Sequence, residues 1–490
     1  MTYIALTIGP IYKTLNSAKK TRDLWGGSYL FSYIMKKIIE EFDAKNFVVP
    51  YTGSEIFEKH QGVGLFHDRF IFESKKGDKE LLEKAIDNVL STLAKNMDNL
   101  DEEFLKNYLQ ISCVEKRVEE GENIILKLTP YLNAKELFFK VSQYDKNLLL
   151  ERLQKNNSFL KREGFGINRG FPTLPKIALH DVFKNNKEMK KFILSKIKDD
   201  DEFSVYEDGE VKEKKIIKPY HKYIAIVHAD GDNMGQVVQN LSTQTEFKNF
   251  SKKLFNYCST SHKLIKAYGG ETIFAGGDDL LFFAPVVNGD RTIFNLINII
   301  SKCFDKRFKE ENQKIKDNDK DKAKQATLSF GLSITYHKFP LYEALERSRD
   351  LLGSVKDMGS KNNIAFTTIK HSGQSFGGVF PKNNKNLYKQ FLALTSNISG
   401  KEGADNFLHS LHHKIYSYRV VFERVASSEQ KLKNFFDNYF NEQEHKQYKL
   451  FFEALIAFIN GVYNDKSIDK KLELVYATLR FVKFIKGDKS

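Results

Sequence analysis

The turn Ala275-Gly276-Gly277-Asp278-Asp279 lies between two apolar stretches, Glu271 to Phe274 and Leu280 to Ala284, which the sequence predicts to be β-strands. An earlier acidic turn, His228-Ala229-Asp230-Gly231-Asp232-Asn233-Met234-Gly235, directly follows the apolar strand predicted at Tyr223 to Val227. A mainly helical stretch separates the two turns. This order of strand, helix and paired strands opens a ferredoxin-like βαββαβ unit.

The two acidic turns should meet in the folded chain. In a βαββ unit the end of the first strand lies beside the hairpin of the next two, so strand pairing brings Asp230 next to Asp278 and Asp279. Three carboxylates in one place repel one another unless cations neutralise them. Oxygen ligands favour Mg²⁺ or Mn²⁺, and two such ions catalyse phosphoryl transfer. We therefore expect these three residues to be catalytic and, with the carbonyl of Gly231, to hold two metal ions.

The residues around the aspartates have predicted roles in binding a nucleotide. Gly276 and Gly277 would allow positive φ in the hairpin and would let a triphosphate approach without a Cβ in the way. The amides of Asn233, Met234 and Gly235 open the following helix, and a helix N-terminus favours phosphate. The alternative is that the hairpin is only a turn, because Gly and Asp are ordinary turn residues. The second acidic turn at the matching strand end favours the catalytic interpretation.

Three further residues are candidates for contacts with a nucleotide. Lys361, in Gly359-Ser360-Lys361-Asn362, could reach a triphosphate as a point charge, or it could be a solvated loop lysine. Ser329 and Gly331 could line a base or ribose pocket. They could equally be strand residues that allow close packing.

The hydrophobic pattern predicts the rest of this unit. A helix is predicted at Thr292 to Phe308, a strand at Thr327 to Thr335, a helix at Leu341 to Lys356 and a closing strand at Ile364 to Thr368. The highly charged stretch Glu310 to Lys324 is predicted to be a surface loop. We expect the helices to lie on one face of the sheet.

The whole chain is predicted to be α+β, with two ferredoxin-like domains of the nucleotidyl-cyclase or polymerase palm type and two mainly helical domains. The expected segments are a first ferredoxin-like domain (1–80, which later segments could complete), a helical domain with a charged connector (81–218), the catalytic domain (219–371) and a C-terminal helical domain (372–490). A joint rich in Gly, Ser and Asn is expected at Ser372 to Asn386. The first domain lacks a paired-acid turn. It should therefore be a catalytically silent twin that completes the pocket or binds a neighbouring subunit.

Composition limits the classes of protein. The chain has 490 residues, 41% of them hydrophobic and 29% charged, which is typical of a globular protein. Its net charge of +14 favours a polyanionic partner, nucleic acid first, although lysine-rich compositions also arise from codon bias. Cys113, Cys258 and Cys303 provide neither a disulfide framework nor a zinc-binding pair, so we expect a cytoplasmic location and no zinc. No run approaches the roughly 18 apolar residues of a membrane span, and no membrane partner is expected.

At the two acidic turns and in several other segments, the sequence resembles the large, palm-containing subunit of type III CRISPR effector complexes, in particular the III-B (Cmr) branch. The resemblance extends over nearly the whole chain, and the two acidic turns are its most specific part. The other segments that carry it are Ile8-Gly9-Pro10-Ile11, Lys20 to Leu30, Gly64 to Phe70 and Gly170 to Ala178.

The resemblance implies a function. The palm of this family converts ATP into cyclic oligoadenylates when the assembled complex binds target RNA, and these messengers activate downstream effectors. The resemblance therefore implies ATP as substrate and Mg²⁺ or Mn²⁺ as the metal. It also implies crRNA, target RNA and sibling Cmr subunits as partners.

The sequence departs from many relatives in two ways. Many relatives carry an N-terminal HD nuclease, whereas this sequence starts at the first palm-like strand. His180-Asp181 is an isolated dipeptide without further metal ligands, so it is expected to begin a helix, and DNase activity is not expected. Relatives often hold a zinc ion through cysteine pairs in the helical domain, which Cys113 alone cannot provide.

Three alternatives stay open beside this interpretation. Some members without the HD nuclease join an AMP unit to S-adenosylmethionine, and the metal triad does not separate this reaction from cyclisation, since both attack an α-phosphate. A non-catalytic scaffold that binds crRNA and sibling subunits is a second alternative, against which the retained carboxylates speak. A diguanylate cyclase of the GGDEF type is a third, and the pair Asp279-Leu280 after the glycines argues against it.

Overall fold

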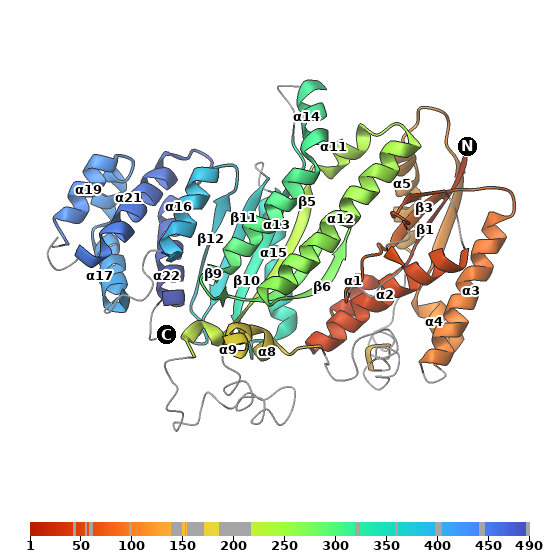
Figure 1. Cartoon of the computed structure of the whole chain (residues 1–490), viewed down its shortest axis with the longest axis horizontal. Helices are drawn as coiled ribbons and strands as arrows, with labels where there is room; N and C mark the ends of the chain where they lie inside the picture. Colours follow the sequence, from red (N-terminus) through yellow and green to blue (C-terminus); the bar gives the residue numbers. More distant parts are fainter. Residues whose placement is uncertain are drawn as a thin grey trace.

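Two large β-sheets organise the chain, and helices pack around and between them (Figure 1). The structure is a computed structural model, and the residues that it describes are 1–42, 46–53, 56–57, 62–97, 100–138, 149–151, 153, 171–185, 217–318, 324–357, 361–396, 404–440 and 446–486. Of the predicted helical domain and charged connector (81–218), residues 98–99, 139–148, 152, 154–170 and 186–216 lie outside these residues. No helix in the described ranges is long and apolar enough to cross a membrane.

The central sheet has six strands in the order β12-β11-β10-β5-β7-β6. Their bounds are β5 Tyr223–Asp232, β6 Glu271–Gly276, β7 Asp279–Pro285, β10 Thr327–Tyr336, β11 Asn363–Ile369 and β12 Ser375–Pro381. The antiparallel neighbours β10-β5-β7-β6 form the ferredoxin-like arrangement predicted from the sequence. β11 adds to β10 in parallel, and β12 closes this edge in the antiparallel direction. A short ribbon of β8 (Val287–Asn288) and β9 (Arg291–Thr292) follows β7.

Helices cover both faces of the central sheet, so the prediction of helices on one face was wrong. α12 (Gln244–Tyr268) and α13 (Ile293–Arg307) pack on the face that carries Ala225 of β5. α15 (Leu341–Asp357) packs on the opposite face, with Ile224. The third helix is needed because the parallel pair β10 and β11 requires a crossover connection. Three short helices complete this part of the chain, namely α8 Leu174–Ala178, α9 His180–Asn185 and α11 Met234–Gln239.

Two segments that the sequence predicts to be irregular contain regular structure. The predicted joint Ser372 to Asn386 includes β12, the edge strand of the central sheet. The predicted loop Glu310 to Lys324 overlaps α14 (Lys309–Asn318). Composition misled both predictions. The glycines of β12 are typical of a loop, but Gly377 is needed in this strand because a Cβ there would collide with the backbone of β11. α14 is polar on most of its surface and so lacks an apolar period.

The N-terminal sheet has the order β2-β3-β1-β4, with antiparallel neighbours throughout. Its strands are β1 Thr2–Thr7, β2 Phe47–Val49, β3 Arg69–Glu73 and β4 Ser112–Arg117. This is again the ferredoxin-like order, as predicted. β4 lies in a region that the sequence predicts to be helical, so the sheet is completed by a segment beyond residue 80. The surrounding helices are α1 Ile11–Leu15, α2 Thr21–Phe42, α3 Asp78–Asn96, α4 Glu102–Tyr108 and α5 Ile124–Glu136.

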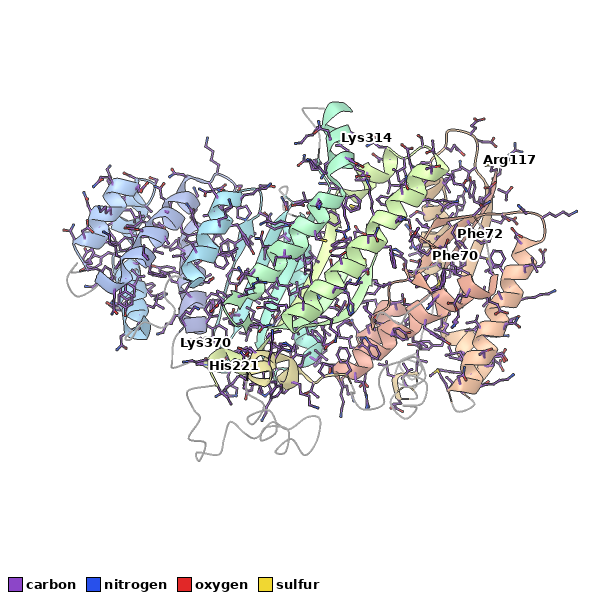
Figure 2. The ribbon with its side chains drawn as sticks, viewed as in Figure 1. Phe70, Phe72, Arg117, His221, Lys314 and Lys370 are labelled. Carbon is purple, nitrogen blue, oxygen red and sulfur yellow. The ribbon has the colours of Figure 1, made fainter. Side chains whose placement is uncertain are left out.

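One apolar core joins the two α/β units. Phe70 and Phe72 lie two residues apart on β3 and so share one face of the N-terminal sheet (Figure 2). The core that contains them continues through α2 to Ile224 and Ile226 of the central sheet. Since each fully buried side chain of this size contributes about 1.5–3 kcal/mol, separating the units would expose a large part of this core.

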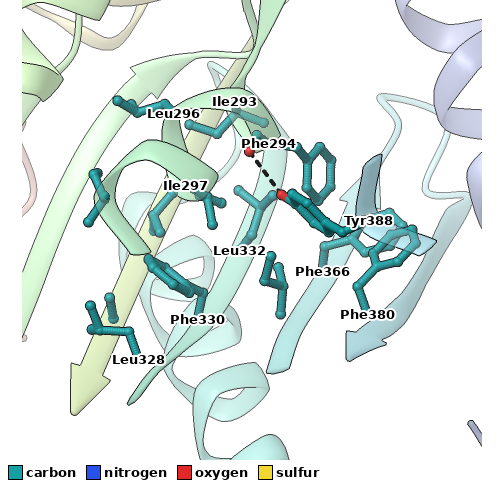
Figure 3. Close-up of a cluster of buried hydrophobic side chains, with 14 of the residues drawn as sticks. Ile293, Phe294, Leu296, Ile297, Leu328, Phe330, Leu332, Phe366, Phe380 and Tyr388 are labelled. Atoms are coloured by element: carbon teal, nitrogen blue, oxygen red, sulfur yellow. Dashed lines mark hydrogen bonds between the residues drawn. The ribbon is translucent and has the colours of Figure 1, made fainter. Parts of the chain in front are cut away.

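A second core lies under α13 and reaches the C-terminal helices (Figure 3). The ring of Phe294 packs against Phe366 of β11 at a centroid distance of 5.3 Å. The hydroxyl of Tyr388 donates a hydrogen bond of 2.8 Å to the carbonyl of Phe294. These contacts attach the helical C-terminal region to the central sheet. Its helices are α16 Lys385–Ser396, α17 Ala404–Ser417, α18 Arg419–Val425, α19 Glu429–Asp437, α21 Lys449–Asn464 and α22 Lys471–Lys486.

Gly331 brings α15 close to the central sheet. A Cβ at this position of β10 would collide with the backbone carbonyl of Ser348 and the backbone nitrogen of Leu352. The close approach allows Lys356, on the last turn of α15, to reach the end of β5. Of the two roles considered for Gly331, the structure therefore supports close packing.

Gly331→Ala is expected to lower the free energy of unfolding by about 1–3 kcal/mol, because the added methyl group has no space between β10 and α15. Denaturant unfolding followed by circular dichroism measures this change. Gly353→Ala is the matched control, since a Cβ there has no neighbour within 4 Å and alanine in a helix is favoured over glycine by about 0.5–1 kcal/mol. Equal effects of the two substitutions would contradict the packing role.

Candidate active site

The two acidic turns meet at one end of the central sheet. In the pairing of β5 with β7, Ala229 lies opposite Leu280. The next position on each strand therefore brings Asp230 and Asp279 to neighbouring places. The two carboxyls interact, because the charge of Asp230 is among the causes that raise the pKa of Asp279.

Asp278 completes the acidic group from the tip of the β6–β7 hairpin. A Cβ at Gly231 would lie 2.7 Å from the β-carbon of Asp278 and would collide with its carboxylate. Gly231 is therefore required because Asp278 occupies the space that a side chain would need. The structure brings together the four residues for which the sequence predicts a shared site: Asp230, Gly231, Asp278 and Asp279.

Burial and repulsion raise the pKa values of two carboxyls. Burial raises the pKa of Asp278 to about 6, and the charge of Asp230 adds to this effect. Burial and the neighbouring charges of Asp278 and Asp230 raise the pKa of Asp279 well above its ordinary value. The side chain of Asp279 is itself exposed to solvent where it faces a cavity, although protein atoms crowd it on its other sides. The site therefore carries more negative charge than the surrounding groups neutralise.

Lys356 supplies a positive charge to this group. Its ammonium pairs with the carboxylate of Asp230 and donates a hydrogen bond of 2.9 Å to the carbonyl of Gly231. Sequence reasoning missed this residue, because one lysine in a lysine-rich chain carries no motif. The topology holds a usable signal: α15 runs antiparallel to β10 and hence parallel to β5, so the two end at the same edge of the sheet.

The donor set fits Mg²⁺ or Mn²⁺ by its chemistry, because three carboxylates and a backbone carbonyl are hard oxygen ligands. In the described part of the chain, however, no group of three or more His, Cys, Asp or Glu side chains is arranged to hold a metal ion. Lys356 contacts two of the oxygens in question, those of Asp230 and Gly231. A metal ion would need these oxygens, so it would need Lys356 to move.

Asp232 and Ser329 form a buried support behind the site. The hydroxyl of Ser329 lies 2.9 Å from both carboxylate oxygens of Asp232. The hydroxyl of Thr327 and the amide of Asn362 donate to the same carboxylate at 2.8 and 3.0 Å. Asp232 and Ser329 are both fully buried, and neither lines the cavity. Ser329 is therefore placed to hold Asp232. The contact with a nucleotide that the sequence suggested as one possibility is not seen in this arrangement.

His67 of the N-terminal unit packs against the tip of the acidic hairpin. Gly277 has a φ of +68°, and a Cβ there would lie 2.7 Å from the imidazole of His67. The thiol of Cys258 donates a hydrogen bond of 3.2 Å to the carbonyl of Gly277. Of the two hairpin glycines only Gly277 has the positive φ predicted for both, whereas Gly276 is required because a Cβ would press on the ring of Phe274.

Two histidines beside the cavity are uncharged at neutral pH. Burial lowers the pKa of His67 to about 4. Burial, helped by the charge of Arg349, lowers the pKa of His228 to about 4 as well. The hydroxyl proton of Ser348 goes to the carbonyl of Leu345 at 2.9 Å, so Nδ1 of His228 is assigned as the donor to the hydroxyl oxygen at 2.7 Å. His228 thereby links β5 to α15.

A cavity of about 920 Å³ lies between the two α/β units, next to the acidic group. This volume falls in the range of small-molecule sites, roughly 300–1,000 Å³. The N-terminal unit contributes Ile8, Gly9, Pro10, Lys13, His67, Asp68, Arg69, Thr129 and Glu136. The central unit contributes His228, Asp230, Met234, Gly235, Gly276, Gly277, Asp278, Asp279 and Arg349. Four of the residues predicted to bind a nucleotide thus line it, namely Met234, Gly235, Gly276 and Gly277.

The other residues predicted to bind a nucleotide lie outside the cavity wall. Asn233 has a φ of 58°, and its side chain donates to the carbonyl of Gln325 at 2.9 Å. Lys361 is half-buried and does not line the cavity. α11, which begins after Asn233, has only six residues, so the charge at its N-terminus is small.

The N-terminal wall of the cavity holds a compact polar network. Arg69 donates to one oxygen of Glu136 at 2.6 and 3.0 Å, and the hydroxyl of Thr7 donates to the same oxygen at 2.6 Å. Crowding by the surrounding protein raises the pKa of the neighbouring Asp68, although this residue is exposed to solvent at the cavity, and the charge of Arg69 partly offsets the effect. Asp68 directly precedes β3, as Asp278 directly precedes β7.

The dipeptide His180-Asp181 begins α9, as the sequence predicts. Asp181 forms a buried hydrogen bond of 2.9 Å with His221, whose ring in turn accepts from the amide of Lys218 at 2.8 Å. His221 is labelled in Figure 2, below the central sheet and away from the acidic hairpin. This pair therefore fastens a helix to the segment before β5.

Two family models match this chain. Residues 223–365 match the model described as Cas10/Cmr2, second palm domain. Residues 3–102 match the model described as CRISPR-associated protein Cmr2, N-terminal. The first match begins with β5 and contains every residue of the acidic group, and the second contains the first three strands of the N-terminal sheet.

A curated protein with a similar sequence is also a Cmr2 subunit. The CRISPR system Cmr subunit Cmr2 of Pyrococcus furiosus is 26% identical over 282 residues, which are 52% of this chain and 30% of that protein. The match thus spans less than a third of this curated relative.

Solved structures show the same fold. A chain of the type III-B Cmr-beta complex bound to cognate target RNA has a TM-score of 0.56 and 11% identity, over 89% of this chain and 78% of that one. A chain of the Csm1-Csm4 cassette in complex with cA4 has a TM-score of 0.52 and 13% identity, over 99% and 69% respectively. At such identities these likenesses support the fold alone.

The raised carboxyl pKa values predict how stability depends on pH. A carboxyl with a raised pKa keeps its proton in the folded protein at a pH where the unfolded chain has lost it, so stability falls as pH rises through this window. For Asp278 the window runs from its ordinary value of 3.8 to about 6.

Asp278→Asn, in metal-free protein, should therefore raise the melting temperature near pH 8 by about 2 °C or more and have little effect near pH 4. Differential scanning calorimetry in the presence of a chelator measures both values. Asp290→Asn is the control, because Asp290 lies in another hairpin turn of the same unit. A gain that is the same at both pH values would rule out repulsion as its cause.

Proposed function

The chain belongs to the Cas10/Cmr2 family, and from this premise we propose that it is an RNA-activated nucleotidyltransferase that converts ATP into a cyclic oligoadenylate. The observation that carries the proposal is the convergence of Asp230, Asp278 and Asp279 beside a cavity of about 920 Å³. Two of these carboxyls have raised pKa values, so the group is short of positive charge.

The reaction would be attack of a ribose hydroxyl on the α-phosphate of ATP, with formation of a P–O bond and release of pyrophosphate. Asp230, Asp278, Asp279 and the carbonyl of Gly231 would hold two Mg²⁺ or Mn²⁺ ions. When bound, such ions activate the attacking oxygen and stabilise the charge on the leaving group. The fixed register of β5 and β7 keeps the carboxylates together, so little reorganisation is needed when the substrate binds.

The nucleotide would lie in the cavity between the two units. Gly276, Gly277, Met234 and Gly235 form its wall near the acidic group, and the small residues let phosphate come close. This geometry does not favour two of the nucleotide contacts predicted from the sequence, those of Lys361 and Ser329. Lys361 lies outside the wall and Ser329 is buried behind it.

The N-terminal unit would complete the substrate site and not perform catalysis itself. It supplies one side of the cavity wall, including Arg69 and Glu136, and it contacts the acidic hairpin through His67. Its β1 is followed by Ile8-Gly9-Pro10, whereas the end of β5 carries Asp230 and Asp232, so the N-terminal unit lacks the paired acids.

RNA and sibling subunits are the proposed partners. A structural neighbour of this chain is part of a Cmr-beta complex with target RNA, and another is a Csm1-Csm4 cassette with cA4. The net charge of +14 favours association with crRNA and target RNA. We propose that target RNA in the assembled complex activates the site.

The product distinguishes the proposed activity from its alternatives. The assembled complex with bound target RNA is incubated with ATP or GTP, each with and without S-adenosylmethionine, and the products are identified by mass spectrometry. Cyclic oligoadenylates from ATP alone are expected. A conjugate of AMP and S-adenosylmethionine would show that the palm performs conjugation and not cyclisation. Product from GTP alone would contradict both, and the absence of any product would favour a scaffold.

Asp278→Ala combined with Asp279→Ala should lower product formation by at least about a hundredfold, since each lost ligand removes several kcal/mol of transition-state stabilisation. Binding of RNA and assembly with sibling subunits should be unchanged in a mobility-shift assay and in size-exclusion chromatography. Asp290→Ala is the control, because Asp290 follows Gly289 in a hairpin turn much as Asp278 follows Gly277. Loss of assembly in the double variant would show that the acidic turn is structural.

A further inference from the structure

Lys356 contacts two of the oxygens that the proposed function assigns to metal. Its ammonium pairs with Asp230 and donates to the carbonyl of Gly231 at 2.9 Å. The side chains of Lys356 and Asp230 are 24% and 29% exposed, so solvent reaches this ion pair only partly. A partly buried ammonium with two oxygen partners is bound more firmly than a surface lysine.

Two other basic groups around the cavity, Arg69 and Arg349, are engaged elsewhere. Arg69 is held by Glu136 on the N-terminal wall. Arg349 lies over the ring of Tyr12, with its guanidinium carbon 3.9 Å from the ring centroid. Within the described ranges, Lys356 is the basic side chain that forms an ion pair with one of the three aspartates, Asp230.

One ammonium neutralises only part of the negative charge of the three aspartates. Lys356 brings a single positive charge, and its contacts are with Asp230 and the carbonyl of Gly231. A divalent ion brings twice the charge and can accept oxygen ligands from several of these groups at once. The two cations would nevertheless use the same oxygens of Asp230 and Gly231, so they cannot occupy the site together in this arrangement.

We propose that Lys356 is a resident counter-ion that competes with divalent metal for Asp230 and the Gly231 carbonyl, and thereby sets the affinity of the site for metal. This inference rests on the proposed function, which supplies the competing ion. Lys356 stabilises the acidic group while no metal is bound, and binding of the metal displaces its ammonium.

The exchange needs only a side-chain movement. The backbone of α15 is fixed against the sheet at Gly331 and through the hydrogen bond between His228 and Ser348. Lys356 lies beyond these anchors on a flexible four-carbon stem. Its ammonium can therefore leave Asp230 while the helix stays in place.

The test is a titration of the full-length chain with Mn²⁺, in which free Mn²⁺ is measured by electron paramagnetic resonance. Lys356→Met should bind Mn²⁺ about five to ten times more tightly than the wild-type chain, because the competitor is gone. Lys361→Met removes the same charge from a nearby residue outside the cavity wall, and its affinity should change by less than about twofold. Binding by Lys356→Met that is weaker than, or equal to, that of Lys361→Met would overturn the inference.

Melting temperatures provide a readout that a purely structural lysine would not change in the same way. In a chelator, Lys356→Met should melt about 2 °C or more below the wild-type chain, because the acidic group has lost its counter-ion. With saturating Mn²⁺ the two should melt together, since the metal then neutralises the aspartates. An equal deficit under both conditions would show that Lys356 only supports the fold. Lys356→Gln replaces the methionine variant if the latter does not fold.

Asp230→Asn separates the inference from the proposed function. If this variant binds Mn²⁺ as tightly as the wild-type chain, the proposed metal site is wrong and the inference fails with it. If Asp230→Asn loses binding while Lys356→Met shows no gain, the inference alone fails.

Discussion

The structure depends on one unfavourable interaction, the repulsion among three carboxylates that strand pairing holds together. The register of β5 against β7 fixes Asp230 beside Asp279, and the hairpin tip adds Asp278. The sheet prevents them from moving apart, because apolar cores cover it on both faces. Raised pKa values and the contact with Lys356 are two responses to the same crowding. Binding of cations to the site would be a third.

The packing around the site explains how a stable fold can hold such a group. Gly331 lets α15 lie close to β10, so a lysine from that helix reaches the end of β5. Asp232, two residues beyond Asp230, is buried but fully hydrogen-bonded, which avoids the cost of an unpaired buried charge. Within one strand, therefore, one aspartate is structural and the other faces the cavity.

The sequence is sufficient to predict the ferredoxin-like order and the meeting of the two acidic turns, since strand pairing follows from apolar strands and tight turns. It is insufficient where tertiary contacts decide. β12 contains adjacent glycines and resembles a linker, yet it pairs with β11 because a side chain at Gly377 would not fit. Lys356 and His67 lie in ordinary helical and loop sequence and are brought to the site only by the fold. Ser329 lies on the expected strand but faces the buried side.

The contact between His67 and Gly277 has a consequence for how such a protein can change over generations. The histidine belongs to one half of the chain and the glycine to the other, and any side chain at Gly277 would displace the histidine. Recombination that joins the first half of one homologue to the second half of another would bring together two surfaces whose side chains were not selected to fit each other. The two halves are therefore inherited most safely as a single block, even though each has its own complete sheet.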